Sequence, residues 1–322
     1  MPTAATDAAN AAITNAINVE RYKEQYIRSI MPILNKLSAD VEVLILRMDV
    51  TSARDVNAKL KQINQKIDAA FNKILVLSTR EFPELVETAI EQEEEVLAIF
   101  FGGDKEKASI TEKKKQSVIA PILASFVLGK KYTQHLKDVA TAAKNTVSAR
   151  VRGGISDAEN ITIIAKGVRG TKSRRYQDGK FITTLRNMDA IGRSAIQSFV
   201  SKSKIVVYKA AGITSYRWVS VIDGNTSPVC MGRSGKIYIV GSGPLPPAHY
   251  RCRSTITPYR RGMQVPEDYS SWLRAQPKSI VQDILGKTKA KMFLDGNVTL
   301  DKFTTTNGRE LTIKELRDKI KK

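Results

Sequence analysis

The apolar positions of the first hundred residues repeat at the spacing of α-helices. From Ala11 to about Met48, isoleucine, leucine and valine recur at helical intervals, and Pro32 is expected to kink or split this segment. A second stripe from Val56 to Ile74 has spacings of 4, 3, 4, 4 and 3, which places it on one face of a helix. A third helix is predicted from about Pro83 to Phe101. Such stripes are typical of bundle or coiled-coil helices, and they leave self-association of this region open.

A polar, basic segment interrupts the helical pattern. Residues 104–116, DKEKASITEKKKQ, lack apolar periodicity and predict a linker. Helical spacing returns from about Ser117 to Val151 and is expected to end at Gly153-Gly154. Ser156 and Glu159 have the spacing of a capping box, so a short helix is predicted to begin there. A long helix is predicted from about Ile182 to Ala211.

After Gly212 the pattern changes to a period of two. In SYRWVSVID, Tyr216 and Trp218 alternate with Arg217 and Val219, which predicts a strand. KIYIV (236–240) and RSTITP (253–258) predict two further short strands, and helical spacing then returns to the end of the chain. The predicted fold class is α+β, mostly α, with a small antiparallel β element near residues 214–258.

This pattern divides the chain into three expected parts. Residues 1–103 form an acidic N-terminal helical region, 104–116 a basic linker, and 117–322 a helical domain that includes the β element and C-terminal helices from about 267 to 322. No apolar run approaches the roughly 18 residues that span a bilayer, and the start of the chain lacks the features of a signal peptide. We therefore expect a protein that is not embedded in a membrane.

Charge is distributed unevenly over these parts. The 322 residues carry a formal net charge of +20. Residues 1–104 hold 11 basic and 16 acidic side chains, a net −5, whereas the remainder holds 41 basic and 16 acidic side chains, a net +25. An excess of this size favours a polyanionic partner, most simply a phosphate backbone. A basic surface without a nucleic-acid role is the alternative.

The basic clusters lack the interleaved aromatic residues of a single-strand stacking platform, and no base-reading motif accompanies them. We therefore expect phosphate contacts without sequence preference. An acidic protein surface, or solvent alone, would suit the same clusters. The candidate contact residues are Lys113, Lys114, Lys115, Arg150, Arg152, Arg169, Lys172, Arg174, Arg175, Arg251, Arg260 and Arg261.

The segment PPAHYRCRS (246–254) brings together His249, one of two histidines, and Cys252, one of two cysteines. With Cys230 they offer three metal ligands, and Asp223 is a distant fourth, whereas a structural zinc site needs four. A zinc ion and a disulfide between the cysteines are kept as alternatives. The leading interpretation is a rigid corner fixed by Pro246 and Pro247, with buried thiols and a hydrogen-bonded histidine.

Catalysis at this segment is not expected. In a strand-like segment His249 and Cys252, three residues apart, point to opposite faces, which disfavours a cysteine nucleophile with a histidine base. One histidine and Asp223 are also few for a histidine-metal nuclease. We therefore expect no enzyme activity and no cofactor.

DGNTSPVCMGRSGKIY followed by PPAHYRCRSTITP resembles the signature of the phage Mu F-like head morphogenesis family, and the resemblance covers about residues 150–318. Two departures stand out: Arg233 and Ser254 occupy positions where many relatives carry cysteine. The positions that match the family motif, together with Trp218 and Pro246 beside them, are expected to form a structural scaffold. These residues are Trp218, Asp223, Thr226, Cys230, Gly235, Pro246, Pro247, His249, Cys252 and Arg253.

The resemblance implies a minor head protein of a tailed bacteriophage, located inside the capsid near the portal and in the host cytoplasm during assembly. It implies a part in head morphogenesis and in packaging or ejection of the genome. The expected partners are the portal protein, the major capsid or scaffolding protein and double-stranded genomic DNA. The alternative is a zinc-ribbon-like DNA-binding or metal-dependent nuclease module.

Overall fold

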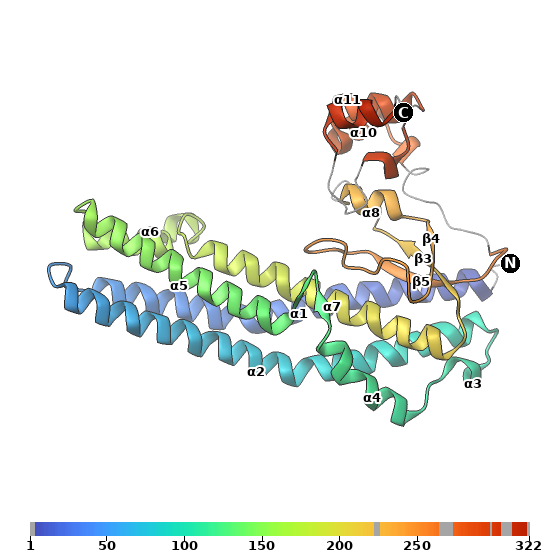
Figure 1. Cartoon of the computed structure of the whole chain (residues 1–322), viewed down its shortest axis with the longest axis horizontal. Helices are drawn as coiled ribbons and strands as arrows, with labels where there is room; N and C mark the ends of the chain where they lie inside the picture. Colours follow the sequence, from blue (N-terminus) through green and yellow to red (C-terminus); the bar gives the residue numbers. More distant parts are fainter. Residues whose placement is uncertain (1–3, 222–225, 264–272, 297, 304–310, 321–322) are drawn as a thin grey trace. The chain divides into compact units, whose positions relative to one another are not determined.

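The computed structural model describes residues 4–221, 226–263, 273–296, 298–303 and 311–320. Most of the described chain is helical, and five short strands form two antiparallel sheets, so the predicted fold class is confirmed (Figure 1). None of the described helices has the length and apolar character that crossing a membrane requires. The chain divides into two compact units, which interleave along the sequence: unit 1 comprises 1–20, 86–122 and 197–322, and unit 2 comprises 21–85 and 123–196.

Two long helices open the chain, α1 (Ala4–Leu46) and α2 (Ala53–Phe100). Both contain an internal proline, so Pro32 does not split the first helix, and the predicted separate helix from Pro83 is wrong. Pro32 is exposed, whereas Ile30 and Leu34 on either side of it are fully buried. The buried stripe therefore continues across the proline, and packing holds the helix together despite one missing backbone hydrogen bond.

Unit 2 has a polar cluster within its apolar core. The Tyr26 hydroxyl lies 2.8 Å from the Ser78 hydroxyl and 2.5 Å from the Tyr132 hydroxyl, and all three residues are buried. Phe82 packs against both tyrosine rings, with centroid distances of 5.1 and 5.2 Å. Burial raises the pKa of both tyrosines, so the hydroxyls remain protonated and able to donate.

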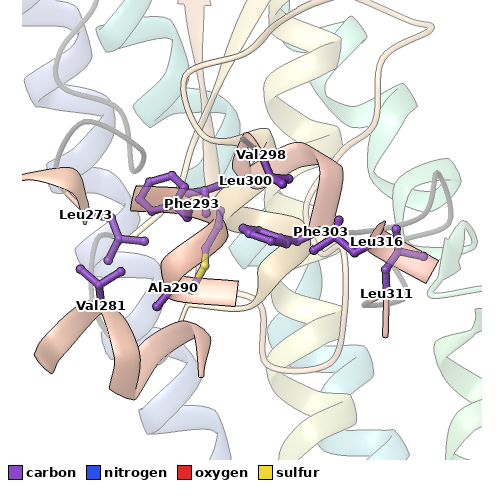
Figure 2. Packing of buried hydrophobic residues seen from close by; sticks show 10 residues of the cluster. Leu273, Val281, Ala290, Phe293, Val298, Leu300, Phe303, Leu311 and Leu316 are labelled. Atoms are coloured by element: carbon purple, nitrogen blue, oxygen red, sulfur yellow. The ribbon is translucent and has the colours of Figure 1, made fainter. Parts of the chain in front are cut away.

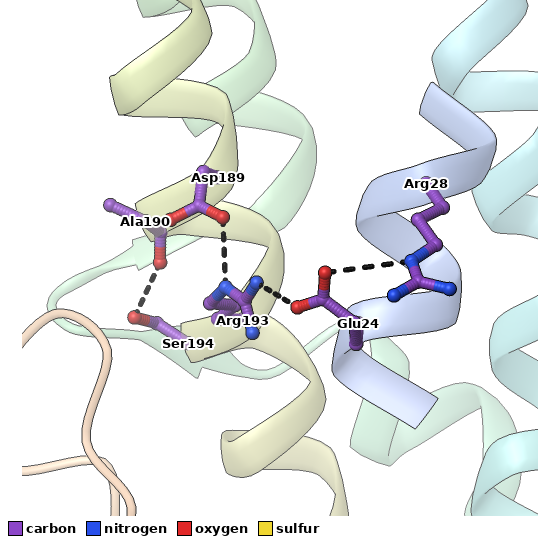
Figure 3. A network of polar contacts seen from close by, with 6 residues as sticks. All are labelled: Glu24, Arg28, Asp189, Ala190, Arg193 and Ser194. Carbon is purple, nitrogen blue, oxygen red and sulfur yellow. Dashed lines mark hydrogen bonds and ion pairs between the residues drawn. The ribbon is translucent and has the colours of Figure 1, made fainter. Parts of the chain in front are cut away.

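An ion-pair network joins helices α1 and α7 (Ile182–Ala210) within unit 2. Arg193 contacts Glu24 at 2.6 Å and Asp189 at 2.8 Å, and Glu24 also contacts Arg28 at 3.6 Å (Figure 3). The hydrogen bond from Arg193 lowers the pKa of the exposed Glu24 carboxyl. The observed α7 agrees with the long helix predicted from about Ile182 to Ala211.

The expected linker is itself helical and packed. Residues 104–116 contain α3 (Lys105–Ala108) and the start of α4 (Glu112–Leu123). Glu94 of α2 accepts a hydrogen bond from the backbone of Ile110 and pairs with Lys115 at 2.8 Å. Residues 104–116 belong to the same compact unit as the end of α2. The boundaries between the two units therefore do not fall at the expected linker.

The chain then forms a small hairpin, β1 (Phe126–Val127) and β2 (Lys130–Lys131), before α5 (Tyr132–Ser156) and α6 (Ile161–Arg169). Helix α5 runs through Gly153 and Gly154 instead of ending there, because Gly154 allows the Ile164 side chain of α6 to pack closely. The short helix after the pair exists, but Asn160 caps it instead of Ser156.

The second sheet belongs to unit 1. Its strands are β3 (Ser215–Val219), β4 (Ile237–Ile239) and β5 (Thr255–Tyr259), in the order β4-β3-β5 with both pairings antiparallel. All three strands were expected, β3 from the alternation of its side chains. A short helix, α8 (Pro228–Arg233), lies between β3 and β4 in the chain.

The C-terminal elements enclose their own apolar cluster (Figure 2). They are α10 (Lys278–Leu285), α11 (Lys287–Leu294), the 3-10 turn η2 (Leu300–Phe303) and α12 (Ile313–Ile320). Met231 of α8 belongs to this cluster together with Phe293 and Phe303, so the cluster is attached to the β element. The helices expected here are present, apart from the stretch 264–272, which lies outside the described residues.

Candidate functional site

The two halves of the sequence motif meet beside Trp218 of the central strand β3. Trp218 is fully buried and packs with Val229, Cys230 and Cys252. Pairing of Trp218 with Ile256 in β5 brings the end of the second half of the motif to this strand. The first half reaches it through α8, whose N-cap Ser227 accepts a hydrogen bond from the backbone of Cys230. The expected scaffold is therefore one packed cluster in unit 1.

Cys230, His249 and Cys252 converge at the centre of this cluster. The two sulfur atoms are 3.7 Å apart, and Nε2 of His249 lies 3.2 Å from Cys230 Sγ. Both cysteines are buried and unbridged, and His249 is half-buried. Within the described residues this is the single group of three or more histidine, cysteine or carboxylate side chains that could hold a metal ion, with all ligand atoms within 4.8 Å of one another.

The segment that carries His249 and Cys252 is a turn, and the expectation of a strand-like segment with side chains on opposite faces is wrong. The backbone nitrogen of Cys252 donates to the carbonyl oxygen of His249, 3.3 Å away. Arg251, inside the turn, has a φ of 59°. The chain therefore reverses between the two residues, and both side chains reach Cys230.

One hydrogen bond decides the protonation of the imidazole. Nδ1 of His249 lies 2.8 Å from the carbonyl oxygen of Tyr250, which can only accept, so Nδ1 carries a proton. In the neutral ring Nε2 then carries no proton, and its lone pair faces the sulfur atoms. Burial acts to lower the pKa of His249, but contact with Cys252 outweighs it and the pKa is raised.

The two thiols differ in acidity because they share a hydrogen bond. That bond, supported by His249, holds the pKa of Cys252 well below its usual range. The same bond, together with burial, raises the pKa of Cys230. The arrangement favours one thiolate and one thiol next to a histidine, which is a set of soft, electron-rich donors.

A second layer of hydrogen bonds, which sequence reasoning missed, surrounds the cluster. The Ser220 hydroxyl donates to the backbone carbonyl of Cys230 at 2.8 Å and accepts from Trp218 Nε1 at 2.9 Å. Ser254 Oγ lies 3.1 Å from Ser220 Oγ. The serine at position 254 thus ties β5 to β3. Nothing in the alternation of side chains signals these bonds, because they depend on the pairing of distant strands.

Among the other motif residues, Thr226 and Gly235 form hydrogen bonds to the backbone around the end of β3. Thr226 donates to the carbonyl oxygen of Val221 at 2.5 Å, and Gly235, with a φ of 80°, donates to the carbonyl oxygen of Trp218. The Pro246-Pro247 peptide bond is cis. Arg253 is half-buried, and the Asp223 position lies outside the described residues.

Several of the candidate contact cations are already engaged inside the protein. Lys115 pairs with Glu94 at 2.8 Å, Arg150 pairs with Glu159 at 2.5 Å, and Arg169 pairs with Glu42. Arg152 donates to Asn57 at 2.8 Å. Arg260 is exposed but lies over the Phe100 ring at 5.3 Å. Lys115, Arg150 and Arg169 are therefore partly buried and neutralised by carboxylates, and are poorly placed to meet a polyanion, whereas Arg152 and Arg260 remain exposed.

The other candidates are exposed, and three of them share one loop. Lys172, Arg174 and Arg175 project from the connection between α6 and α7, whereas Lys113, Lys114, Arg251 and Arg261 lie on other segments. Sequence reasoning missed three further exposed cations at or near the same connection, Lys166, Lys180 and Arg186. These three cations lie close in the sequence to Lys172, Arg174 and Arg175, so they could have been added to the candidates if an ordered loop had been expected here. The α6–α7 loop is defined here as residues 170–181.

Comparisons with protein-family models, with curated proteins and with solved structures found no match to this chain. The function therefore has to be argued from the residues and their geometry.

Proposed function

We propose that this protein is a non-enzymatic minor head protein of a tailed bacteriophage, acting near the portal inside the capsid. The observation that carries the proposal is the union of the two motif halves around Trp218. Cys230 comes from one half and His249 and Cys252 from the other, and their contacts are buried. A motif that builds a packed core element serves a structural role, which agrees with the resemblance to head morphogenesis proteins.

The α6–α7 loop supports contact with double-stranded DNA. Its Asp178 carboxylate accepts hydrogen bonds from the backbone nitrogen and the hydroxyl of Thr171, at 2.8 and 2.7 Å, and these bonds lower the pKa of Asp178. Lys180 and Phe181 donate backbone hydrogen bonds to Gly167 and Val168, both at 2.9 Å. The loop is thus braced at both ends. Because the loop backbone is already ordered, it loses little conformational entropy when the cations bind a partner.

Helix α2 carries a run of four glutamates, Glu91 and 93–95, which is less available as a protein-docking surface than its charge indicates. Glu93 is buried, and Glu94 pairs with Lys115. Only part of the run is therefore free to meet protein partners such as the portal or the capsid and scaffolding proteins. Exposed Glu91 and Glu95 are the residues of the run that we expect to contribute to such contacts.

The proposal is tested by titrating the purified full-length protein with the portal protein encoded in the same genome and, separately, with random-sequence double-stranded DNA over a salt series. We expect saturable portal binding at a low, defined stoichiometry. We also expect DNA affinity to fall steeply with salt, because binding releases counterions from the phosphates. No portal binding, combined with metal-dependent cleavage of the DNA, would overturn the proposal in favour of a nuclease module.

A further inference from the structure

The scaffold role explains why Cys230 and Cys252 are buried and His249 is half-buried, but it does not explain why their three donor atoms face one another. A packed corner could be built from apolar side chains at lower cost, since buried polar groups have to be compensated. We propose that these three residues bind one zinc ion. The inference does not depend on the proposed function, because a zinc ion would stabilise this element in any protein.

The distances agree with the edges of a tetrahedral site. Zinc binds thiolate sulfur at about 2.3 Å and imidazole nitrogen at about 2.0–2.1 Å, so two sulfur ligands lie about 3.8 Å apart and a sulfur and a nitrogen about 3.5 Å apart. The observed separations are 3.7 Å between the sulfur atoms and 3.2 Å between Cys230 Sγ and His249 Nε2. Adjustments of a few tenths of an ångström would admit the ion.

The imidazole is already oriented as a ligand. A histidine that binds zinc through Nε2 generally donates its Nδ1 proton to a carbonyl or carboxylate oxygen, which fixes the ring and its tautomer. His249 makes this bond to the Tyr250 carbonyl oxygen. The nitrogen that faces the two sulfur atoms is therefore the one that has a lone pair to give.

The chemistry of the donors selects zinc among the common ions. Two thiolates and an imidazole are soft and borderline ligands, whereas magnesium and calcium require oxygen. The two sulfur atoms are 3.7 Å apart, so they are not joined by a disulfide, in which the S–S bond is about 2.05 Å.

Three protein ligands leave one coordination position for a solvent molecule or a further donor. Arg233 and Ser254 stand where additional cysteines would complete a four-sulfur or mixed site. The Ser254 hydroxyl is occupied with Ser220, and the Arg233 side chain lies over the Trp218 ring at 5.2 Å. The site is thus expected to bind zinc more weakly than a complete four-ligand site.

The test uses the full-length protein, purified with a reductant, loaded with zinc and dialysed. We compare the wild type with Cys252→Ser, His249→Gln and His135→Gln. His135 is the matched control, because it is the other histidine of the chain and it bonds to the Val127 carbonyl oxygen in the other unit. Metal content is measured directly, and cobalt substitution reports thiolate ligands through a charge-transfer band.

We expect about one zinc per chain in the wild type and in His135→Gln, and at least a tenfold loss of affinity in Cys252→Ser and His249→Gln. The cobalt form of the wild type should show the thiolate band. If the folded wild type holds no zinc at saturating concentration, or if the two ligand variants hold as much as the wild type, the inference is wrong. Failure to bind zinc would leave portal and DNA binding untouched, so the two proposals fail separately.

Discussion

Lys204 of α7 and Glu93 of α2 form an ion pair in the interior of unit 1, with Nζ 2.8 Å from Oε2 and side-chain exposures of 4% and 1%. Glu93 Oε1 accepts a hydrogen bond from Tyr208 at 2.6 Å, and Lys204 also donates to the Ile256 carbonyl oxygen of β5 at 3.3 Å. Glu93 Oε2 contacts the ammonium group of Lys204, but the angle of this contact is not that of a hydrogen bond. This pair therefore connects both helices to the sheet that carries the Cys230 cluster.

Removing one charge of this pair should be costly. Lys204→Met leaves Glu93 buried and uncompensated, which destabilises by about 3–5 kcal/mol. The double variant Lys204→Met/Glu93→Gln should recover most of this loss, because the amide can still accept from Tyr208 and no buried charge remains. Denaturant unfolding of the three proteins measures the difference. A double variant no more stable than Lys204→Met would contradict the assignment.

The hydroxyl cluster of unit 2 predicts an unequal effect of two similar substitutions. Tyr26→Phe removes the hydroxyl that contacts both Ser78 and Tyr132, and we expect a loss of about 1–3 kcal/mol. Tyr132→Phe leaves the 2.8 Å contact between Tyr26 and Ser78 in place, whereas Tyr26→Phe leaves only the longer 3.2 Å contact between Ser78 and Tyr132, so the loss in Tyr132→Phe should be smaller. Thermal unfolding ranks the two variants, and equal losses would show that the cluster does not act as described.

Two glycines of unit 2 should respond in opposite directions to alanine. A Cβ at Gly179 would clash with the backbone of Arg169 and Gly170, so Gly179→Ala should displace the α6–α7 loop and lower the unfolding temperature. Gly153 lies in α5 with open space around it, and Gly153→Ala should stabilise the helix by about 0.5–1 kcal/mol. If both variants melt alike, the close approach at Gly179 is not a constraint.

The α6–α7 loop predicts where DNA affinity resides. The variant Lys172→Ala/Arg174→Ala/Arg175→Ala should lower the affinity for random-sequence duplex DNA and reduce the salt slope by up to about three. The matched control is Arg54→Ala/Lys61→Ala/Lys73→Ala, which removes three exposed cations from α2 in the same unit. An equal loss in the control would mean that net charge, and not this loop, governs binding.

Apolar periodicity predicted the helices well where a long stripe was present. The stripes of α1, α2 and α7 were recognised because their buried positions repeat every three or four residues, and the alternation around Trp218 predicted β3. Breaks were predicted less well. Pro32 was expected to kink or split a helix and Pro83 to begin one, whereas packing of the flanking apolar residues keeps both helices continuous.

Polar segments were the other source of error. Residues 104–116 have no apolar stripe, yet they are helical in part, because Glu94 binds the backbone of Ile110 and the side chain of Lys115. A sequence pattern cannot signal a contact with a helix that lies earlier in the chain. The same reason explains why Lys115 and Arg169 were proposed as partner contacts, although each has an acidic partner in an earlier helix.

The sequence by itself determined the mostly helical class, the position of the β element and the presence of two cysteines and a histidine near it. Only the tertiary structure decided that these three side chains meet. Their meeting requires the turn from His249 to Cys252, the capped start of α8 and the pairing of β5 with β3. The first two are local, but the pairing joins strands that lie far apart in the chain, and it brings the two halves of the motif together. Local periodicity reports which face of an element is buried, but it does not contain the distances between elements.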